Sequence, residues 1–309
     1  MTVDTNDCYH PSRPVPSPAR LELPLAGGGH TSVFLHSPPP GVEPRLPVLY
    51  VHGIQSHPGW FAGSAAFLAA AGHPVFQLTR RGSGDSQARP GHARSPWQLM
   101  DDLAAAGELV AQRTGSRRLH LLGVSWGGKL LAAWVGTGGL FPAGLEGASL
   151  TLVAPGLSPR VDVPISTKLL VALSLLCCPG RRYAIPLSDV ELFTDNSSFQ
   201  QYLRDDPLRL HKATARFLYV SRQLDRIVRV LSDNCLDLPV RLILAERDRI
   251  IDNVATAEVV TRLSFQEPSI VTLGGAHSLE FEEDPSPLFK AIWEGLANKE
   301  QDPAPASNP

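Results

Sequence analysis

The pattern Gly-x-Ser-x-Gly occupies residues 123–127, where the sequence reads GVSWG. An apolar run at 119–122 predicts a strand before it, and a run at 129–135 predicts a helix after it. Glycines in a strand–turn–helix allow a tight, strained turn, which would lift the Ser125 hydroxyl off the sheet. The turn would also leave the backbone N–H of Trp126 free to bind a negatively charged oxygen. A serine in an ordinary glycine-rich turn is the alternative, but this context favours Ser125 as a nucleophile.

A second oxygen-binding loop is expected after the buried strand predicted at 46–51. That strand runs directly into His52 and Gly53. A His-Gly pair at this point fits a loop whose next backbone N–H, that of Ile54, binds the same oxygen as Trp126. We interpret His52 as a structural residue that shapes the turn rather than one that moves protons.

An acidic cluster follows the strand predicted at 240–245. Its members are Glu246, Asp248 and, slightly later, Asp252. A carboxylate just past a strand can reach an imidazole through a short loop, and Asp248 has the most suitable position. Glu246 and Asp252 are competitors for this role, and Asp252 could instead cap the next helix. A solvated loop carboxylate is the alternative for Asp248.

A histidine, His277, lies between the strand predicted at 270–273 and the last predicted helix. The chain has ten histidines, but the order Ser125, Asp248, His277 distinguishes this one, because it is the order of one large class of catalytic triads. His277 would take the proton from Ser125. Asp248 would hold the imidazole in the required tautomer and stabilise the imidazolium.

These residues need a scaffold, and short apolar strands alternate with helical patterns along most of the chain. Strands are predicted at 21–23, 31–35, 46–51, 74–78, 119–122, 150–153, 240–245 and 270–273, and helices at 62–71, from 95, at 129–135, at 254–263 and from 284. The second helix has Ser95 as its expected cap, Pro96 at its first position and Gln98 to complete a capping box. The alternation predicts an α/β fold with a mostly parallel central sheet covered by helices on both faces.

The alternation lapses in the middle of the chain. We expect residues 157–237 to form a helical cap, inserted into a core made of residues 19–156 and 238–297. The ends, residues 1–18 and 298–309, are rich in Pro and polar residues, so they are expected to be disordered tails.

Composition excludes several classes of function. The 309 residues carry a formal net charge of -2, which gives no electrostatic reason to bind nucleic acid. The four cysteines, Cys8, Cys177, Cys178 and Cys235, form no metal-binding pattern, so no metal or cofactor is expected. The N-terminus has no apolar leader, and the longest apolar run, 169–178, is too short to span a membrane. A cytoplasmic location is expected, and the oligomeric state stays open.

Together these motifs resemble the α/β-hydrolase superfamily over residues 45–295. Three stretches are similar to its serine-aminopeptidase, monoacylglycerol-lipase and lysophospholipase-type branch: the loop RRGSGDS at 80–86, DPL at 206–208 with ATARF at 213–217, and HSLEFE at 277–282. Two positions depart from the branch. Thr79 stands where many members have Asp, and Ala245 replaces a glycine before the acid. The resemblance implies an α/β-hydrolase fold with a helical cap and a Ser-His-Asp triad.

Two apolar segments are candidates for substrate binding. Trp60 and Phe61 could line an acyl pocket, with core packing as the alternative. The segment 169–176 could be a cap helix that covers a lipophilic substrate, through Leu173 and Leu176, or touches a membrane surface transiently. A helix buried against the core is the alternative.

Three basic residues near these motifs have structural interpretations. Lys129 is expected to pack its stem on the sheet side and to reach a carboxylate with its amine, and a functional position near the site is the alternative. Arg80 and Arg81 are expected to form structural ion pairs rather than to recognise a phosphate or carboxylate.

The favoured function is hydrolysis of a small-molecule carboxylic ester with an apolar acyl group, through an acyl-enzyme. An esterase or lipase of monoacylglycerol or lysophospholipid type fits this description. A thioesterase or a small-peptide or amide hydrolase would use the same triad. A non-catalytic α/β-hydrolase-like binding protein is the alternative from another class, and such proteins usually lose a triad residue.

Overall fold

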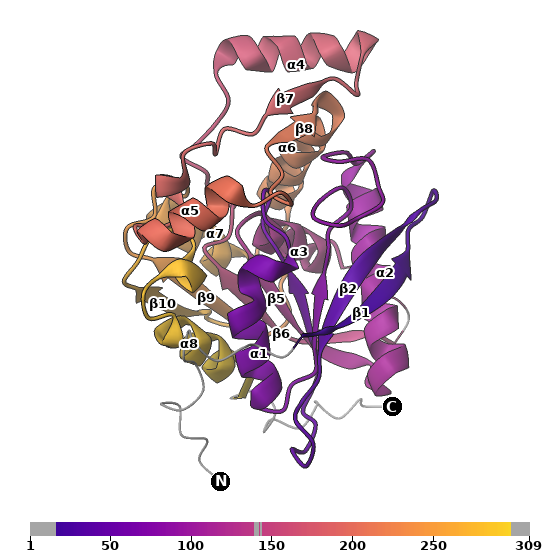
Figure 1. Cartoon of the computed structure of the whole chain (residues 1–309), viewed down its shortest axis with the longest axis vertical. Coiled ribbons are helices and arrows are strands. Elements are labelled where there is room, and N and C mark those ends of the chain that lie inside the picture. Colours follow the sequence, from indigo (N-terminus) through magenta and orange to yellow (C-terminus); the bar gives the residue numbers. More distant parts are fainter. Residues whose placement is uncertain (1–16, 139–141, 143, 298–309) are drawn as a thin grey trace.

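An eight-stranded sheet forms the centre of the computed structural model, which describes residues 17–138, 142 and 144–297 (Figure 1). The expected tails therefore lie almost wholly outside the described residues. The sheet order is β1-β2-β4-β3-β5-β6-β9-β10. The strands are β1 (Ala19–Pro24), β2 (His30–His36), β3 (Val48–Val51), β4 (Val75–Leu78), β5 (Arg118–Val124), β6 (Glu146–Val153), β9 (Val240–Ala245) and β10 (Ser269–Leu273). The hairpin β1–β2 and the pair β2–β4 are antiparallel, and all other neighbours are parallel.

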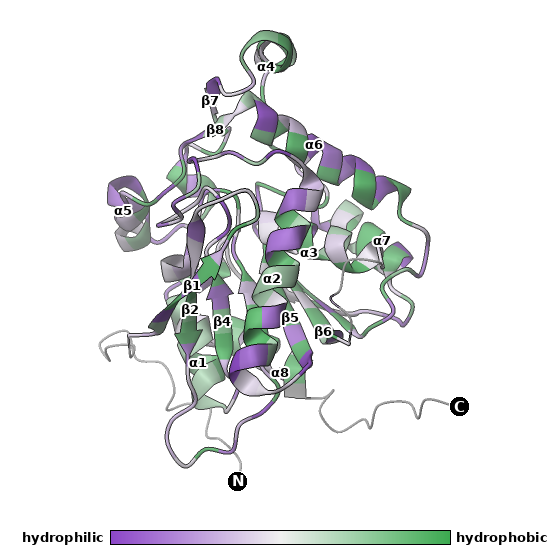
Figure 2. Ribbon diagram, turned by 90° about the vertical axis from the view of Figure 1, so that its right-hand side faces the viewer, coloured by the Kyte–Doolittle hydropathy of each residue, from purple (hydrophilic) through white to green (hydrophobic). Residues whose placement is uncertain are grey.

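The central strands are buried on both faces, as a parallel sheet between helices requires. All four residues of β3 and all four of β4 are buried. The covering helices are α1 (Ala62–Ala70), α2 (Pro96–Thr114), α3 (Trp126–Gly136), α7 (Asn253–Leu263) and α8 (Ser286–Ala297). In Figure 2 the sheet lies between α1 on one side and α3 and α7 on the other. The predicted α/β architecture is present, with strand and helix positions close to those expected.

Helix α2 begins at the predicted residue. The Ser95 side chain accepts a hydrogen bond from the backbone N–H of Gln98, and Pro96 occupies the first turn. The Gln98 side chain accepts from the backbone N–H of Arg94 rather than that of Ser95, so only half of the predicted capping box forms. Gly115 ends the helix in a left-handed conformation, with φ of 75°.

The segment between β6 and β9 is mostly helical and lies above the carboxyl ends of the strands (Figure 1). It contains α4 (Ile165–Cys177), β7 (Arg182–Ala184), η2 (Val190–Leu192), α5 (Ser197–Asp205), β8 (Lys212–Thr214) and α6 (Ala215–Val230). β7 and β8 form a two-stranded antiparallel sheet that the sequence did not predict within this helical cap. Helix α6 packs on both α3 and α4. Within the described chain, no helix combines the length and apolar character needed to cross a membrane.

The end of this segment is attached to the core by hydrogen bonds. The backbone N–H of Thr214 donates to the carbonyl oxygen of Gly91 at 2.8 Å, and the backbone N–H of Leu210 donates to that of Gln55 at 2.9 Å. The guanidinium of Arg209 donates to the Gln55 side chain at 2.9 Å. The loop after β3 is therefore held from above by residues that return from the inserted segment.

A buried ion pair joins the loop after β4 to helix α2. The Arg81 guanidinium contacts both carboxylate oxygens of Asp102, at 2.7 and 2.6 Å, and these side chains are only 7% and 5% exposed. Burial raises the pKa of the Asp102 carboxyl, although Arg81 lowers it. The effect of desolvation on this pKa is therefore larger than the opposite effect of the Arg81 charge and hydrogen bonds. Removing one partner of such a buried pair destabilises the fold strongly, because the other charge is left buried alone.

We predict that Arg81→Met lowers the free energy of unfolding by about 3–5 kcal/mol, because it leaves the Asp102 carboxylate buried without its partner. The double variant Arg81→Met/Asp102→Leu should recover most of this loss. Urea unfolding measures both, and Glu108→Gln, which removes an exposed ion pair with Arg117, should cost less than about 1 kcal/mol. A single variant as stable as Glu108→Gln would contradict the prediction.

Candidate active site

Ser125 sits in a strained turn between β5 and α3. Its φ is 53° and its ψ is -121°, a conformation that residues other than glycine rarely adopt. The glycines around it are required by close packing. A Cβ on Gly127 would lie 2.3 Å from the carbonyl oxygen of Val51, and one on Gly123 would lie 2.7 Å from the Cα of Gly128. The turn predicted from the pentapeptide is therefore present in the structure.

The three residues singled out by chain order form one hydrogen-bonded line. The Nε2 of His277 lies 2.9 Å from the Ser125 Oγ, and its Nδ1 lies 2.7 Å from the Asp248 Oδ2. The acceptor carboxylate fixes the tautomer: Nδ1–H donates to Asp248, and Nε2 is left to accept from the serine hydroxyl. The side chains of His277 and Asp248 are 2% and 0% exposed, so this line is shielded from water.

The carboxylate of Asp248 is held by its own loop. Its Oδ1 accepts hydrogen bonds from the backbone N–H groups of Ile250 and Ile251, at 2.8 and 3.0 Å. The two competing carboxylates lie elsewhere. Asp252 caps helix α7 by accepting from the backbone N–H of Ala255, and Glu246 points into a separate hollow described below.

The loop after β3 lies against Ser125. A Cβ on Gly53 would lie 3.3 Å from the Ser125 Cβ, so the loop backbone passes directly over the serine. Trp126 is the first residue of α3, and a helix cannot satisfy its first backbone N–H groups internally. Ile54 and Trp126 both line the same cavity as Ser125. The two N–H groups expected to bind a negatively charged oxygen thus belong to residues on the wall of one cavity.

His52 stabilises this loop as a neutral ring. Its Nδ1–H donates to the carbonyl oxygen of Gly53 at 2.9 Å, and its Nε2 accepts from the backbone N–H of Arg80 at 3.0 Å. Burial, followed by the nearby Arg80 charge, holds the pKa of His52 well below its usual value. A neutral, fully hydrogen-bonded ring fits the structural interpretation.

Among the residues that the structure describes, Arg80 has no carboxylate partner of the kind expected from the sequence. Its guanidinium donates to the carbonyl oxygen of Ile54 at 2.9 Å and lies 4.9 Å from the centre of the Trp126 ring and 5.0 Å from that of Phe217. Burial lowers the pKa of Arg80 to about 9. The expectation was wrong because carbonyl oxygens and aromatic faces, rather than a carboxylate, satisfy the charge. Arg80 thereby connects both loops that flank Ser125.

Ser125 opens into a cavity of about 370 Å³ between the core and the inserted segment. Its lining is mostly apolar: Ile54, Trp126, Gly156, Pro159, Val161, Val163, Val171, Ala172, Leu175, Ile185, Pro186, Leu187, Leu218, Ile250 and Ile251, with polar groups from Lys129, Asp162, Lys168, Tyr219, Ser221, Arg222 and Asp225. The cavity is therefore suited to an apolar ligand whose reacting carbon reaches the serine hydroxyl.

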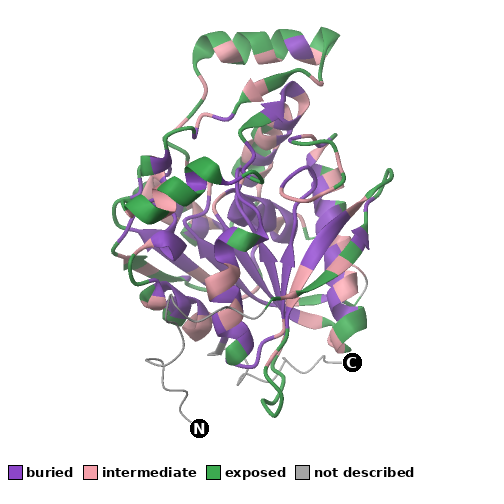
Figure 3. Ribbon diagram, viewed as in Figure 1, coloured by how far each residue is buried: buried purple, intermediate pink, exposed green. Residues whose placement is uncertain are grey.

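Helix α4 presents a different face to this cavity from the one predicted. Val171, Ala172 and Leu175 line it, whereas Leu173 and Leu176 point away and are 60% and 87% exposed. Figures 2 and 3 show α4 as an apolar yet largely exposed helix at the edge of the molecule. A helix that is apolar all round has no hydrophobic stripe, so the sequence could not indicate which face turns inward.

Trp60 and Phe61 do not line the cavity, contrary to the substrate-binding expectation. Both are buried, at 3% and 4% exposure. The Trp60 ring packs edge-on against Phe193, which in turn contacts the His277 ring edge-on at 6.2 Å between centroids. Both residues thus show the core-packing alternative, and Trp60 supports the histidine through Phe193.

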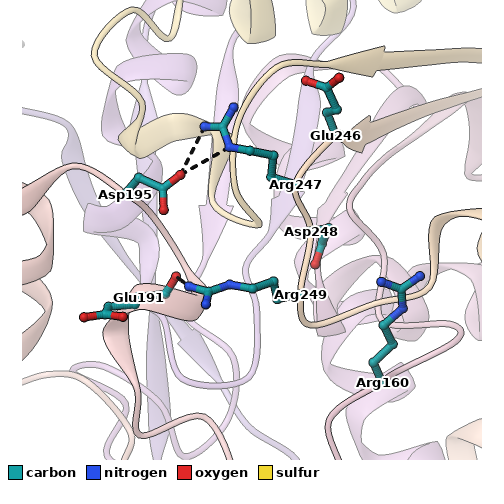
Figure 4. A pocket seen from close by; sticks show the side chains of 7 residues that line it. All are labelled: Arg160, Glu191, Asp195, Glu246, Arg247, Asp248 and Arg249. Carbon is teal, nitrogen blue, oxygen red and sulfur yellow. Dashed lines mark hydrogen bonds and ion pairs between the residues drawn. The ribbon is translucent and has the colours of Figure 1, made fainter.

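A second hollow, of about 510 Å³, lies behind the carboxylate of the triad (Figure 4). Its walls carry charged side chains: Arg160, Glu191, Asp195, Glu246, Arg247, Asp248 and Arg249. Arg247 pairs with Asp195 at 3.1 Å, and Arg249 donates to the carbonyl oxygen of Glu191. Neither Ser125 nor His277 lines this hollow, whereas Ser125 opens into the apolar cavity described above. Within the described ranges, no group of three or more His, Cys, Asp or Glu residues could hold a metal ion.

Comparison with known proteins agrees with this geometry. Residues 42–284 match the family of serine aminopeptidases, S33. The chain belongs to this family. It is 24% identical over 273 residues to a monoacylglycerol lipase of Mycolicibacterium smegmatis, covering 86% of this chain and 93% of that protein. The branch of the α/β-hydrolase superfamily predicted from the sequence is thereby confirmed.

Solved structures share the fold at low sequence identity. A monoacylglycerol lipase of Paleococcus ferrophilus has a TM-score of 0.73 at 19% identity, covering 87% of this chain and 99% of that chain. A soluble variant of a monoglyceride lipase from Saccharomyces cerevisiae, in complex with a substrate analogue, has a TM-score of 0.78 at 17% identity, covering 94% and 97%. Such similarity confirms the predicted α/β-hydrolase fold.

One buried polar residue lies close to His277 but was not singled out from the sequence. Glu280, three residues after His277, is 6% exposed and accepts a hydrogen bond from the backbone N–H of Ser64 at 2.7 Å. Burial raises its pKa from 4.5 to about 7, against the lowering effect of the N–H groups at the start of α1. Its position just after the histidine is the only sequence signal that could have drawn attention to it.

We predict that Glu280→Gln changes how stability depends on pH. The folded state binds a proton at Glu280 below about pH 7, whereas the unfolded carboxyl releases it above about 4.5. Wild-type stability therefore falls as pH rises between these values, and glutamine cannot lose a proton. The free energy of unfolding of Glu280→Gln should gain about 3 kcal/mol relative to wild type between pH 4.5 and 8.

Urea unfolding at pH 4.5, 6 and 8 measures this difference. Glu283→Gln is the matched control, because it makes the same substitution at an exposed glutamate three residues after Glu280. The stability difference between Glu280→Gln and wild type should change with pH more than that of Glu283→Gln. Equal changes in the two variants would contradict the prediction.

Proposed function

We propose that this protein is a serine hydrolase that cleaves carboxylic esters through a covalent acyl-enzyme. The observation that carries the proposal is the continuous line from Asp248 through His277 to Ser125, with contacts of 2.7 and 2.9 Å at the floor of an apolar cavity. Membership of the S33 family supports a serine hydrolase. The relative named monoacylglycerol lipase supports ester hydrolysis over the other reactions of such triads.

The first half of the reaction acylates the serine. The Ser125 Oγ attacks the ester carbonyl carbon while the His277 Nε2 takes the hydroxyl proton, and Asp248 stabilises the resulting imidazolium. The backbone N–H groups of Ile54 and Trp126 bind the oxyanion of the tetrahedral intermediate. The imidazolium then returns its proton to the leaving alcohol oxygen as the C–O bond breaks, which leaves an acyl group on Ser125.

The second half releases the acid. Water attacks the acyl carbon while the Nε2 of His277 accepts one of its protons. The second tetrahedral intermediate collapses, and the proton passes to the Ser125 Oγ. The strained turn holds the serine oxygen in the same place for both attacks, and the buried imidazole needs no rearrangement between them.

The segment 157–237 is proposed to act as a cap over this site. Val171 and Leu175 of α4 face the cavity, so they would contact the acyl chain of a lipophilic ester such as a monoacylglycerol. The opposite face of α4, with Leu169, Leu173 and Leu176, is exposed and apolar. We propose that this outer face touches a membrane surface transiently while the substrate enters, because exposed apolar patches commonly mark interaction surfaces.

We predict that Ser125→Ala lowers kcat/KM on p-nitrophenyl esters by about 10⁴-fold or more, with the fold retained. Asp248→Asn should cost about 10³–10⁴-fold, since the histidine then loses the partner that fixes its tautomer. Glu246→Gln, two residues away, is the matched control and should stay close to wild type. A fluorophosphonate probe should label wild type and fail to label Ser125→Ala.

Two outcomes would overturn the assignment. Wild-type turnover by Ser125→Ala would exclude it as the nucleophile. Collapse on Glu246→Gln with an active Asp248→Asn would move the acid to Glu246.

The two faces of α4 offer a matched pair of variants. We predict that Val171→Ser/Leu175→Ser flattens the rise of kcat/KM with acyl-chain length, because each buried methylene contributes about 0.8 kcal/mol in an apolar pocket. Acetate esters should be spared, because their acyl group is too short to reach the cap. Leu173→Ser/Leu176→Ser should leave soluble esters unaffected and slow only the hydrolysis of esters presented in phosphatidylcholine vesicles.

Chain-length series of p-nitrophenyl esters and a vesicle assay measure the two effects. Equal losses on acetate and long-chain esters in the inner pair would mean that these residues only stabilise the fold. An unchanged vesicle rate in the outer pair would exclude membrane contact through α4.

A further inference from the structure

One end of the catalytic cavity is polar, and it is built by α3 and α6. The Lys129 Nζ lies 2.7 Å from the Asp225 Oδ1, and the side chains are 6% and 18% exposed. Arg222 approaches the other oxygen of Asp225 at 3.5 Å. Ser221 lies beside Lys129, and all four residues line the cavity that holds Ser125. An ion pair in this position is not needed for the proposed reaction steps.

The hydrogen bonds in this cluster leave mainly donors facing the cavity. The Ser221 Oγ accepts from the Trp126 indole N–H at 2.9 Å and from Lys129 at 3.4 Å. A hydroxyl that accepts twice has only its proton left to offer. Lys129 spends two of its three N–H groups on Ser221 and Asp225, as far as the described residues show. The carboxylate of Asp225, by contrast, already faces two cations.

The charges around the cavity point the same way. Three cations, Lys129, Lys168 and Arg222, and two carboxylates, Asp162 and Asp225, line it. The cavity wall therefore carries one net positive charge, and its uncharged polar residues are Ser125, Tyr219 and Ser221. A neutral polyol would need acceptors as well as donors, whereas an oxyanion needs only donors and a positive charge.

We propose that this polar end is a specificity pocket for an anionic group, a phosphate or a carboxylate, carried by the ester substrate. The inference rests on the proposed ester hydrolysis and names its substrate class as anionic amphiphilic esters. Ser221 and Arg222 would donate to the oxyanion, with Lys129 supplying charge from behind. The pocket is connected to the reacting serine through one side chain: Trp126 follows Ser125 in the chain, and its indole N–H donates to Ser221.

Turnover of matched esters tests the specificity. The substrates are 1-octanoyl-glycerol, its 3-phosphate, and the octanoyl esters of glycolate and of ethylene glycol. The wild type should have the higher kcat/KM for each anionic member of the two pairs. Arg222→Gln should reduce that preference about fivefold, and Lys129→Met/Asp225→Leu, which removes the buried pair as a unit, at least as much. Both variants should lower kcat/KM on the anionic ester of each pair more than on its neutral counterpart.

Arg226→Gln is the matched control, because it removes the same charge from an exposed position one turn further along α6, outside the cavity. It should leave the preference unchanged. A preference for the phosphate alone would identify a phosphorylated headgroup, and an equal preference for glycolate would identify a carboxylate-tolerant pocket. Equal rates on charged and neutral esters in the wild type would overturn the inference while leaving ester hydrolysis intact.

Direct binding separates the pocket from turnover. Octyl phosphate, octanoate and octanol are titrated by calorimetry into the Ser125→Ala protein, with and without Arg222→Gln. Tighter binding of an anion than of octanol, lost in Arg222→Gln, supports the anionic pocket whether or not any ester is hydrolysed. If the anion binds but no ester is hydrolysed, only the proposed function fails. Equal binding of all three, insensitive to Arg222→Gln, overturns the anionic pocket.

Discussion

The backbone of Ser125 is held at a φ of 53°, and the surrounding structure must supply the free energy, about 1–3 kcal/mol, that this conformation costs. Its N–H donates to the carbonyl oxygen of Val153 at 2.9 Å, and its own carbonyl oxygen accepts from Gly128 and Gly156 at 3.0 and 2.8 Å. Strands β5 and β6 and helix α3 therefore fix the turn from both sides. The helix start approaches β3 so closely that only glycine fits at position 127.

The inserted segment depends on the same region, because its return to the core is anchored on the loop that follows β3. Asp206 accepts hydrogen bonds from the Trp60 indole at 2.6 Å and from His57 at 3.0 Å. Burial alone would raise the pKa of Asp206, but these hydrogen bonds bring it below its usual value, so the carboxylate stays charged at neutral pH. A buried charged anchor thus fixes the return of the segment above Ser125, and exclusion of water there would strengthen electrostatic interactions at the site.

Local sequence signals were sufficient for much of this arrangement and insufficient for the rest. Strand positions, the turn at Ser125 and the proximity of Asp248 and His277 followed from periodicity and chain order, because parallel strands bring their carboxyl ends to one edge of the sheet. The inward face of α4 could not be predicted, since the helix carries leucines on more than one face. The partner of Lys129 was expected to be a carboxylate, but Asp225 lies 96 residues away, and only the packing of α6 on α3 brings the two together.

Trp126 is where these constraints meet. Its backbone belongs to the turn, its ring stacks on Phe217 at 5.4 Å, its indole N–H donates to Ser221, and the Arg80 guanidinium lies over it. Arg80 in turn holds the carbonyl oxygen of Ile54, on the opposite side of Ser125. A ligand that hydrogen-bonds to Ser221 would therefore affect Trp126, whose backbone N–H would bind the oxyanion. Packing that joins the polar end of the cavity to the turn gives the headgroup a physical route to influence acylation, beyond any contribution to binding.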